Sequence, residues 1–248
     1  LWEWQPELLA YHYSEAGMAD NAVTYWFDAG KLAGEHSANR EAVSHFSKAL
    51  ELLETLEDTE ERKWRELDLL IALGPALIAS KGLATPEVSQ VYARALMLCS
   101  ELPESSRHFA VLWGWSRISS NYPTRYERAE RMLALAQRLQ NQRLIIQAYH
   151  SLWTSSFHLG QPEACYQYIE KGLALYEAKT DDYHWHVSIY GGHGAHICGI
   201  GRAALSLWLR GYPQTALDKL DEALDRAKEV NHLGSMIHVM DIALLLYY

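Results

Sequence analysis

Proline and cysteine are scarce in this chain of 248 residues, which has 7 Pro and 3 Cys beside 15 Gly. So little proline and glycine excludes a collagen-like chain and argues against wholesale disorder. The cysteines, Cys99, Cys165 and Cys198, lie far apart and are never spaced CxxC. They therefore indicate a reducing compartment, with no disulfide framework and no cysteine-based zinc motif.

Basic residues and long apolar runs are also in short supply. Lys and Arg number 22 against 31 Asp and Glu, so the net charge is -9, which argues against nucleic acid as a partner. The longest apolar run, 242–248, is too short to span a membrane, and the N-terminus has no signal-peptide pattern. We expect a folded, soluble, cytoplasmic protein that binds neither nucleic acid nor membranes.

The two ends of the sequence are unusual. The chain opens Leu1-Trp2-Glu3-Trp4 without an initiator Met, and its last residues are apolar up to Tyr248. Such an ending would leave an apolar face uncovered. The sequence therefore predicts that residues 1–248 are a piece of a longer polypeptide.

Helical periodicity accounts for most of the chain. In 40–56, Ala42, Phe46, Ala49 and Leu53 recur at helical spacing with polar residues opposite, which predicts an amphipathic helix. Similar patterns predict helices over 62–80, 87–102, 125–139, 143–158, 162–178, 203–209 and 214–230. Alternating β-branched segments are lacking, so the class is all-α. Pro75 falls inside one periodic run and predicts a kink there.

Proline and glycine mark the expected helix boundaries. Prolines that suit a first helical turn are Pro6, Pro86, Pro103, Pro123, Pro162 and Pro213. Glycines that suit a left-handed helix end are Gly17, Gly82, Gly160 and Gly211. Gly199 and Gly201 are expected to let another helix approach closely.

A small–large–small pattern recurs in several helices. It is complete in Ala22–Trp26–Ala29, Ala42–Phe46–Ala49 and Ala216–Leu220–Ala223, and partial at Ala164 and Tyr168. This pattern resembles the tetratricopeptide repeat, although the spacing here is wider than the usual period of about 34 residues. We count helix pairs at 5–29, 31–56, 60–102, 107–140, 142–179 and 187–230, then a helix at 232–248. The resemblance implies one right-handed superhelical solenoid of antiparallel helix pairs, with the first helix of each pair on the concave face.

Three passages resemble a narrower group of proteins. They are LLAYHYSEAG (8–17), LGPALIASKG (73–82) and LSLWLRGYPQTAL (205–217). They look like the repeat region of bacterial multidomain proteins that carry a class III adenylate/guanylate cyclase domain and an AAA-type, STAND-like ATPase. The resemblance implies a parent that makes a cyclic nucleotide. The chain itself has no GxxxxGK[ST] motif, so we expect a non-catalytic interaction and regulatory module of a signalling protein. The alternatives are a small-effector sensor array of a STAND-type transcription regulator, and an enzyme with an unrecognised helical fold.

Most aromatic residues on the apolar faces are expected in the core, namely Trp26, Phe46, Tyr92, Trp113, Trp153, Tyr168 and Trp208. The register of the first helices places a second set toward the concave face, where a protein or peptide, the parent's own catalytic domains, or a small effector would bind. This set is Tyr11, Ser14, Gln147, His150, Thr154, Phe157, Leu205 and Trp208.

Histidine is abundant, with 12 residues. His193 and His196 would lie one helical turn apart and are the candidate metal ligands, whereas Cys198 is expected to point to a different side. The glycines of Gly191-Gly192-His193-Gly194 resemble a phosphate-binding nest. For both features an ordinary role is favoured, as hydrogen-bonded histidines and a flexible connection. We therefore expect no metal and no cofactor, and no nucleophile at Cys198.

Overall fold

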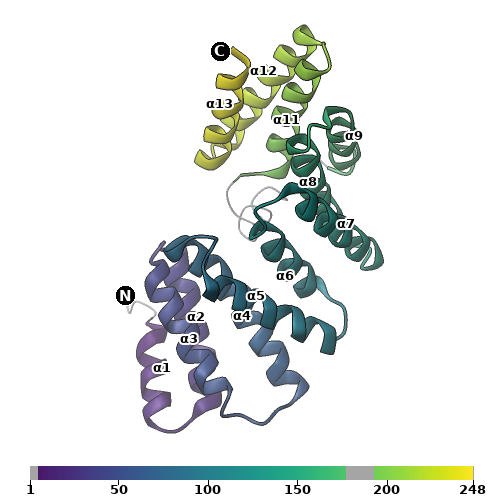
Figure 1. Cartoon of the computed structure of the whole chain (residues 1–248). Helices are drawn as coiled ribbons and strands as arrows, with labels where there is room; N and C mark the ends of the chain where they lie inside the picture. The colour runs from purple at the N-terminus through teal and green to yellow at the C-terminus, as the bar shows by residue number, and fades with distance from the viewer. Residues whose placement is uncertain (1–4, 177–192, 248) are drawn as a thin grey trace. The chain divides into compact units, whose positions relative to one another are not determined.

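The computed structural model describes residues 5–176 and 193–247, and all regular structure in these ranges is α-helical. The chain divides into two compact units, Leu1–Ile118 and Ser119–Tyr248. Both are built from consecutive helices, and most neighbouring helices are joined by short turns (Figure 1). Among the described helices, none has the length and apolar character needed to cross a bilayer. The all-helical class predicted from the sequence is confirmed.

The first unit contains six described helices: α1 (Pro6–Glu15), α2 (Ala19–Glu35), α3 (Asn39–Leu53), α4 (Glu60–Lys81), α5 (Pro86–Glu101) and α6 (Ser106–Arg117). Each helix packs against the next, and α4 also contacts α2 and α6. Helix α4 runs without interruption through Pro75. Two ion pairs tie α4 to its neighbours, because Arg94 of α5 binds Glu66 in a bidentate pair and Arg107 of α6 binds Asp68.

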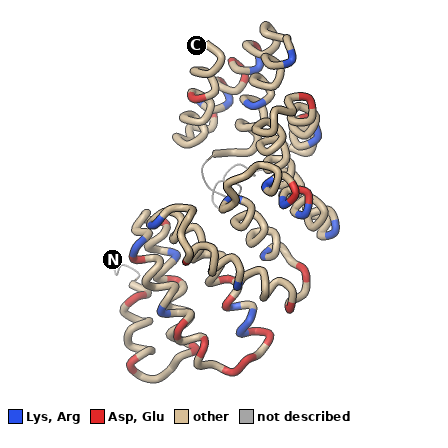
Figure 2. Tube along the Cα trace, in the orientation of Figure 1, with Lys and Arg blue, Asp and Glu red and all other residues tan. Residues whose placement is uncertain are grey.

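The second unit contains α7 (Tyr122–Arg138), α8 (Gln142–His158), α9 (Pro162–Leu173), α11 (Ala195–Leu209), α12 (Pro213–Val230) and α13 (Leu233–Tyr247). Consecutive helices pack together here too, and α11 also contacts α8 and α13. We call α8, α11 and α13 the inner row of the second unit. Acidic and basic positions are interspersed along both units (Figure 2).

Helix boundaries follow the proline and glycine signals. Prolines stand at the start of α1, α5, α7, α9 and α12, whereas Pro103 lies in the turn before α6. The four glycines expected at helix ends, Gly17, Gly82, Gly160 and Gly211, all have positive φ. This conformation carries a steric cost for any residue with a Cβ.

One predicted boundary is wrong. The sequence suggested a break between pairs at Gly30, but α2 runs unbroken from Ala19 to Glu35, so 5–56 holds three helices rather than four. A glycine is needed at position 30 of α2, because the Phe46 ring of α3 lies where the Cβ of any other residue would be. The glycine serves helix packing there and does not end a helix.

The small–large–small pattern lies in the core as expected. Ala22, Trp26 and Ala29 are at most 5% exposed, and the sets beginning at Ala42 and Ala216 are equally buried. In α9 the prediction was one residue out of register. Ala164 and Tyr168 are half-buried, and the buried set is Cys165–Ile169–Gly172.

Most of the expected aromatic core is confirmed, with some exceptions. Trp26, Phe46, Tyr92 and Trp153 are buried, Trp113 and Tyr168 are half-buried, and Trp208 is 42% exposed. The close approach expected at two glycines of α11 is also present. A Cβ on Gly201 would lie 2.8 Å from Ile242 of α13, and one on Gly199 would lie 3.2 Å from Leu173. These glycines therefore let the inner row pack tightly.

Candidate functional site

The predicted concave-face residues fall into two groups. Tyr11 and Trp208 are exposed, and Ser14, Thr154 and Phe157 are half-buried. Gln147, His150 and Leu205 are buried, at 2%, 8% and 6% exposure. Gln147, His150 and Leu205 therefore do not lie on an open face as expected, because α8 and α11 are each packed against several other helices.

In the first unit, Ser14 contributes to packing between α1 and α2. Its hydroxyl donates to the carbonyl of Ala10 at 2.7 Å and accepts from Nε1 of Trp26 at 3.0 Å. Tyr11 is on the same helix and is 53% exposed, beside the exposed side chains of Leu8 and Leu9. Ser14 is thus an internal link between two helices, while Tyr11 is available at the surface.

In the second unit, Phe157 of α8 contacts a positive charge from α11. The guanidinium of Arg202 lies over the Phe157 ring, 4.7 Å from its centroid. Next to Phe157, the His158 ring stacks on Tyr122 at 4.3 Å, and Arg125 lies over Tyr122. Burial lowers the pKa of His158, and the charges of Arg202 and Arg125 lower it further. Tyr122 and Arg125 at the start of α7, Phe157 and His158 at the end of α8, and Arg202 in the middle of α11 therefore form an electropositive, aromatic face. We call it the Arg202 face.

Arg202 is half-buried and has no carboxylate partner among the described residues, and its buried Nε makes no hydrogen bond there. The other arginine near this helix differs. Arg210, just beyond α11, pairs with Glu163 at 2.7 Å and lies over Tyr166. A partly desolvated guanidinium without a counter-charge favours an acidic ligand. Sequence reasoning missed Arg202, although it is the one Lys, Arg, Asp or Glu in a helix that is otherwise mostly apolar.

A second cluster joins α8 to the start of α11. His150 of α8, His193 just before α11 and Cys198 of α11 each offer a nitrogen or sulfur atom, and these atoms lie within 4.8 Å of one another. The His238 ring of α13 stacks on His193, with centroids 3.9 Å apart and planes 4° from parallel. All three helices of the inner row thus contribute to this His–Cys cluster.

The structure separates the two predicted metal-ligand candidates. His193 belongs to the His–Cys cluster, but His196 stacks on Tyr176 at 4.3 Å and is not part of it. Cys198, which the sequence interpretation directed elsewhere, takes the place expected for His196. Gly191 and Gly192, the glycines considered as a phosphate nest, lie outside the described residues.

The electrostatics of the His–Cys cluster favour a thiolate. Burial by itself would raise the pKa of the Cys198 thiol, but interactions and hydrogen bonds with His150 and His193 bring that pKa well below its ordinary value. For His150, burial is the largest effect and lowers the pKa of the imidazole, whereas the neighbouring Cys198 raises it. Cys165 has the opposite behaviour, because burial raises the pKa of its thiol to about 11.

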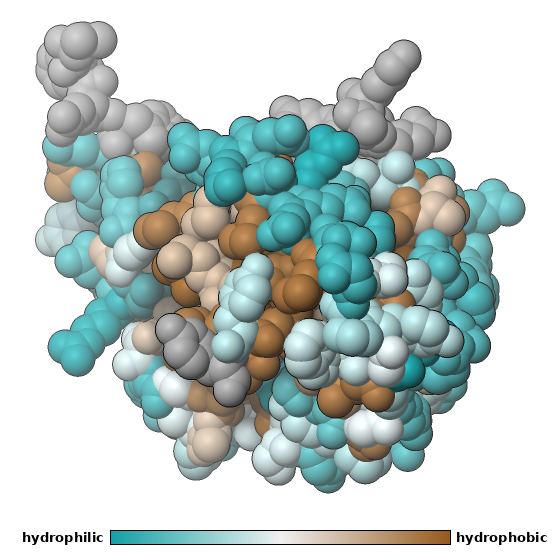
Figure 3. Space-filling model, turned by 90° about the horizontal axis from the view of Figure 1, so that it is seen from above, coloured by the Kyte–Doolittle hydropathy of each residue, from teal (hydrophilic) through white to brown (hydrophobic). Residues whose placement is uncertain are grey.

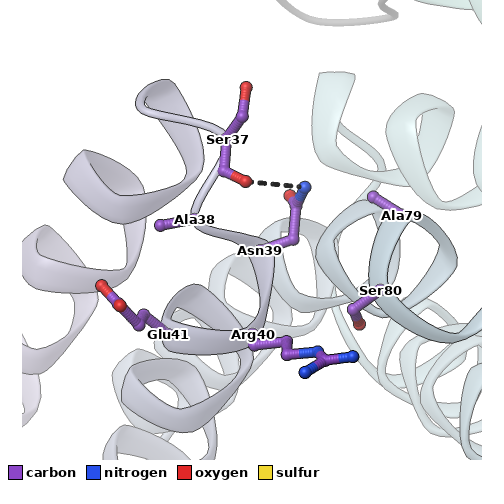
Figure 4. A pocket seen from close by; sticks show the side chains of 7 residues that line it. All are labelled: Ser37, Ala38, Asn39, Arg40, Glu41, Ala79 and Ser80. Carbon is purple, nitrogen blue, oxygen red and sulfur yellow. Dashed lines mark hydrogen bonds between the residues drawn. The ribbon is translucent and has the colours of Figure 1, made fainter.

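Two surface features carry no ligand assignment. A cavity of about 400 Å³ opens between the start of α3 and the end of α4, lined by Ser37, Ala38, Asn39, Arg40, Glu41, Ala79 and Ser80 (Figure 4). In it, the Asn39 side chain donates to the carbonyl of Ser37 at 3.2 Å. An open helix start of this kind is hydrated as readily as it binds an anion.

The other feature is an apolar stripe on α13. Leu233, Ile237, Met240 and Leu244 are each more than half exposed and recur at helical spacing. Apolar side chains also gather in patches on the face seen in Figure 3. Beside the stripe, a cavity of about 290 Å³ is lined by Leu224, Met240, Ala243, Leu244 and Tyr247. Such a stripe marks a packing surface, and nothing in the second unit identifies what covers it.

The sequence resembles part of a much longer protein. No model of a known protein family matches the chain. An uncharacterized protein of Rhizobium meliloti (strain 1021) is 30% identical over 241 residues, which are 94% of this chain and 23% of that protein. The chain therefore spans less than a quarter of the length of the curated relative it matches.

Solved structures resemble the chain over most of its length. Apo RapI matches with a TM-score of 0.70 at 12% identity, over 91% of this chain and 83% of RapI. A STAND signal-transduction ATPase with a tetratricopeptide repeat sensor, from Pyrococcus horikoshii, matches with 0.67 at 12% identity, over 97% and 38%. NprR in complex with its cognate peptide NprX matches with 0.62 at 13% identity, over 98% and 67%. At these identities the likeness establishes the fold, which is a tetratricopeptide-like helical repeat.

Proposed function

We propose that the chain is a non-catalytic protein-interaction module of a larger cytoplasmic signalling protein, and that its second unit binds a peptide with an acidic or free carboxyl end. The observation that carries this proposal is Arg202, half-buried over Phe157 without a carboxylate partner among the described residues. We propose further that the two units are parts of one repeat array. The structural neighbours support this, since each of the three matches more than nine-tenths of the chain.

The Arg202 face has the chemistry that peptide recognition needs. A guanidinium binds a carboxylate through two parallel hydrogen bonds, and a charged hydrogen bond contributes about 1.5–3 kcal/mol. Phe157 and Tyr122 offer aromatic surface for an apolar side chain, and Thr154, one turn before Phe157 on α8, offers a hydroxyl. NprR, which has the same fold, is known in complex with a peptide. That likeness supports a peptide over other acidic partners.

Panning a random peptide library with free C-termini on the intact chain tests this function. We expect enrichment of peptides that combine a terminal or side-chain carboxylate with an apolar neighbour. Arg202→Gln is expected to weaken the affinity for the enriched peptides at least tenfold, because the variant loses a charged hydrogen bond. Fluorescence anisotropy with the labelled peptides measures this change.

Arg226→Gln is the matched control. Arg226 is an exposed arginine of α12 that pairs with Glu229 on its own helix at 2.9 Å. Its loss removes the same charge from the unit but leaves the Arg202 face intact, so peptide affinity is expected to stay within twofold. Equal loss in both variants would show a nonspecific charge effect, and failure to enrich any peptide would contradict the proposal.

The likeness to the STAND protein's repeat sensor supports a second candidate, a sensor array that binds a small effector. A small acid would meet the same guanidinium but not the flanking aromatic surface. Binding of free dicarboxylic acids without binding of any peptide would favour this second candidate. Isothermal calorimetry with both kinds of ligand separates them.

The parent protein is the finer part of the proposal. The resemblance of 8–17, 73–82 and 205–217 implies a parent with a nucleotide cyclase domain and an ATPase domain. The much longer relative in Rhizobium meliloti supports a larger protein without identifying those domains. Reading the gene on both sides of the chain tests this. Cyclase and ATPase motifs are expected upstream, whereas a helix-turn-helix downstream would indicate a transcription regulator.

A further inference from the structure

We propose that His150, His193 and Cys198 form a zinc(II) site in the second unit, which fixes the start of α11 to α8. This site goes beyond the proposed peptide-binding function, because it uses none of the residues of the Arg202 face. Its three ligands come from two helices and from the residue just before one of them. Convergence of three such donors from separate positions is far more specific than a single histidine or cysteine.

The geometry is close to what zinc requires. Zinc binds imidazole nitrogen at about 2.0–2.1 Å and thiolate sulfur at about 2.3 Å in a tetrahedron, which places ligand atoms roughly 3.5 Å apart. The three donor atoms here already lie within 4.8 Å of one another. Small side-chain rotations therefore suffice to close the site. The fourth position is left to water or to another donor.

Burial also matches the requirements of a metal site. Cys198 is 1% exposed and His150 is 8% exposed, so these two ligands are held by the packing of the inner row, and His193 is half-buried. Zinc binds thiolate and neutral imidazole, and its binding releases the thiol proton. His238, stacked on His193, holds the plane of the third ligand.

The donor set selects among possible ions and functions. Two imidazoles and one thiolate suit zinc and exclude the oxygen-loving ions calcium and magnesium. A cysteine with a low pKa beside histidines can also act as a nucleophile. Cys198 is too deeply buried to meet a peptide or other large substrate, whereas a single ion needs little space. The cluster therefore favours metal binding over covalent catalysis.

Metal analysis of the intact chain tests the site first. Chain purified from zinc-supplemented medium without chelators is expected to hold one zinc ion, measured by inductively coupled plasma mass spectrometry. Titration of the metal-free chain with cobalt(II) is expected to give thiolate-to-cobalt charge-transfer absorption and the strong visible bands of a tetrahedral site. Cobalt binding without the thiolate band would overturn the proposal, as would absence of binding.

Matched variants separate this site from the other histidines and cysteines. Cys198→Ser and His193→Gln are expected to abolish the charge-transfer band or to weaken cobalt binding at least tenfold. The controls are His196→Gln and Cys165→Ser, the latter at a second buried cysteine that accepts a hydrogen bond from Ser206. Both variants are expected to keep the charge-transfer band and the cobalt affinity. Loss of the band in the controls as well would contradict the assignment.

A chemical readout on the native chain does not depend on folding of the variants. In urea just below the unfolding transition, where the buried Cys198 becomes reachable by iodoacetamide, zinc is expected to slow alkylation of Cys198 relative to the chelated protein, while Cys99 reacts alike in both. Equal alkylation of Cys198 with and without zinc would overturn the site. None of these measurements involves a peptide, so their failure and the failure of the proposed function are independent.

Discussion

At the scale of single residues, several glycines are required because an aromatic ring occupies the space of a side chain. Tyr92 of α5 lies between two of them. A Cβ on Gly74 of α4 would lie 2.6 Å from the Tyr92 hydroxyl, and a Cβ on Gly114 of α6 would overlap the same ring. In the second unit, a Cβ on Gly172 would lie 2.7 Å from the Trp153 ring. These contacts set how closely neighbouring helices approach.

Gly114→Ala is therefore expected to destabilise the first unit. The added methyl group meets Tyr92, whose ring is confined on its other side by α4, and overpacking costs about 1–3 kcal/mol. The better helix propensity of alanine offsets roughly 0.5–1 kcal/mol of this cost. Urea unfolding followed by circular dichroism measures the change. Gly34→Ala is the control, because a Cβ there has open space and is expected to increase stability.

Tyr92 also makes stability depend on alkaline pH. Burial raises the pKa of its phenol to about 12, against about 10 in the unfolded chain. Above pH 10 the unfolded state loses the proton first, so stability falls as pH rises from about 10 to 12. The loss approaches about 3 kcal/mol. Tyr92→Phe is expected to reduce this dependence in unfolding measurements at pH 9 and 11.5, and the remainder comes from other groups with raised pKa values, such as Cys165. The exposed Tyr11→Phe should retain it, and an unchanged slope in Tyr92→Phe would count against the assignment.

The residues of the proposed sites could be predicted only in part, since these sites depend on contacts between helices. Helix register predicts Thr154 and Phe157 as partner-facing residues, and the proposal keeps them in that role. Arg202 could have been recognised as a lone charge in an apolar helix, but nothing local indicates that it lies over Phe157. His150 and Cys198 come together only because α8 packs against α11. A motif search looks at residues near one another in sequence and cannot find such a pair.

At the scale of helices, local signals predicted most of the elements and their ends. Positive-φ glycines and first-turn prolines are properties of the backbone itself, so the sequence displays them directly. The boundary between the pairs 5–29 and 31–56 was misplaced, because a glycine that ends a helix and one that admits a ring look alike in sequence. Gln147 and Leu205 were misplaced for a related reason. Helix α11 contacts α8, α9, α12 and α13, so it has little outward face to predict.

Two threonines before helices of the first unit allow a test of capping. The Thr59 hydroxyl accepts a hydrogen bond from the Arg62 backbone at the start of α4. Thr85, before α5, makes no such bond, and its buried hydroxyl has no partner among the described residues. Thr59→Ala is expected to cost about 1 kcal/mol, and Thr85→Ala markedly less. Equal losses in urea unfolding would show that the cap bond contributes nothing.

At the scale of the whole molecule, each unit has its own core. One apolar cluster runs from Ala10 to Val111 in the first unit, and separate clusters around Trp153 and Leu220 fill the second. In helical repeats, stability is close to a sum of nearest-neighbour terms. Changes in one unit should therefore be felt mainly within that unit.

This organisation predicts that zinc affects one part of the unfolding reaction. At a free concentration 100 times its dissociation constant, zinc stabilises the state that binds it by about 2.7 kcal/mol. That state is the folded second unit, which contains all three proposed ligands. Hydrogen exchange resolved by mass spectrometry is expected to show slower exchange in α8 and α11 with zinc, and unchanged exchange in α2 and α3. Gly114→Ala should do the reverse, speeding exchange in α4 to α6 alone. If chelation of zinc accelerated exchange equally in both units, they would unfold as one cooperative body and the division of stability between them would be wrong.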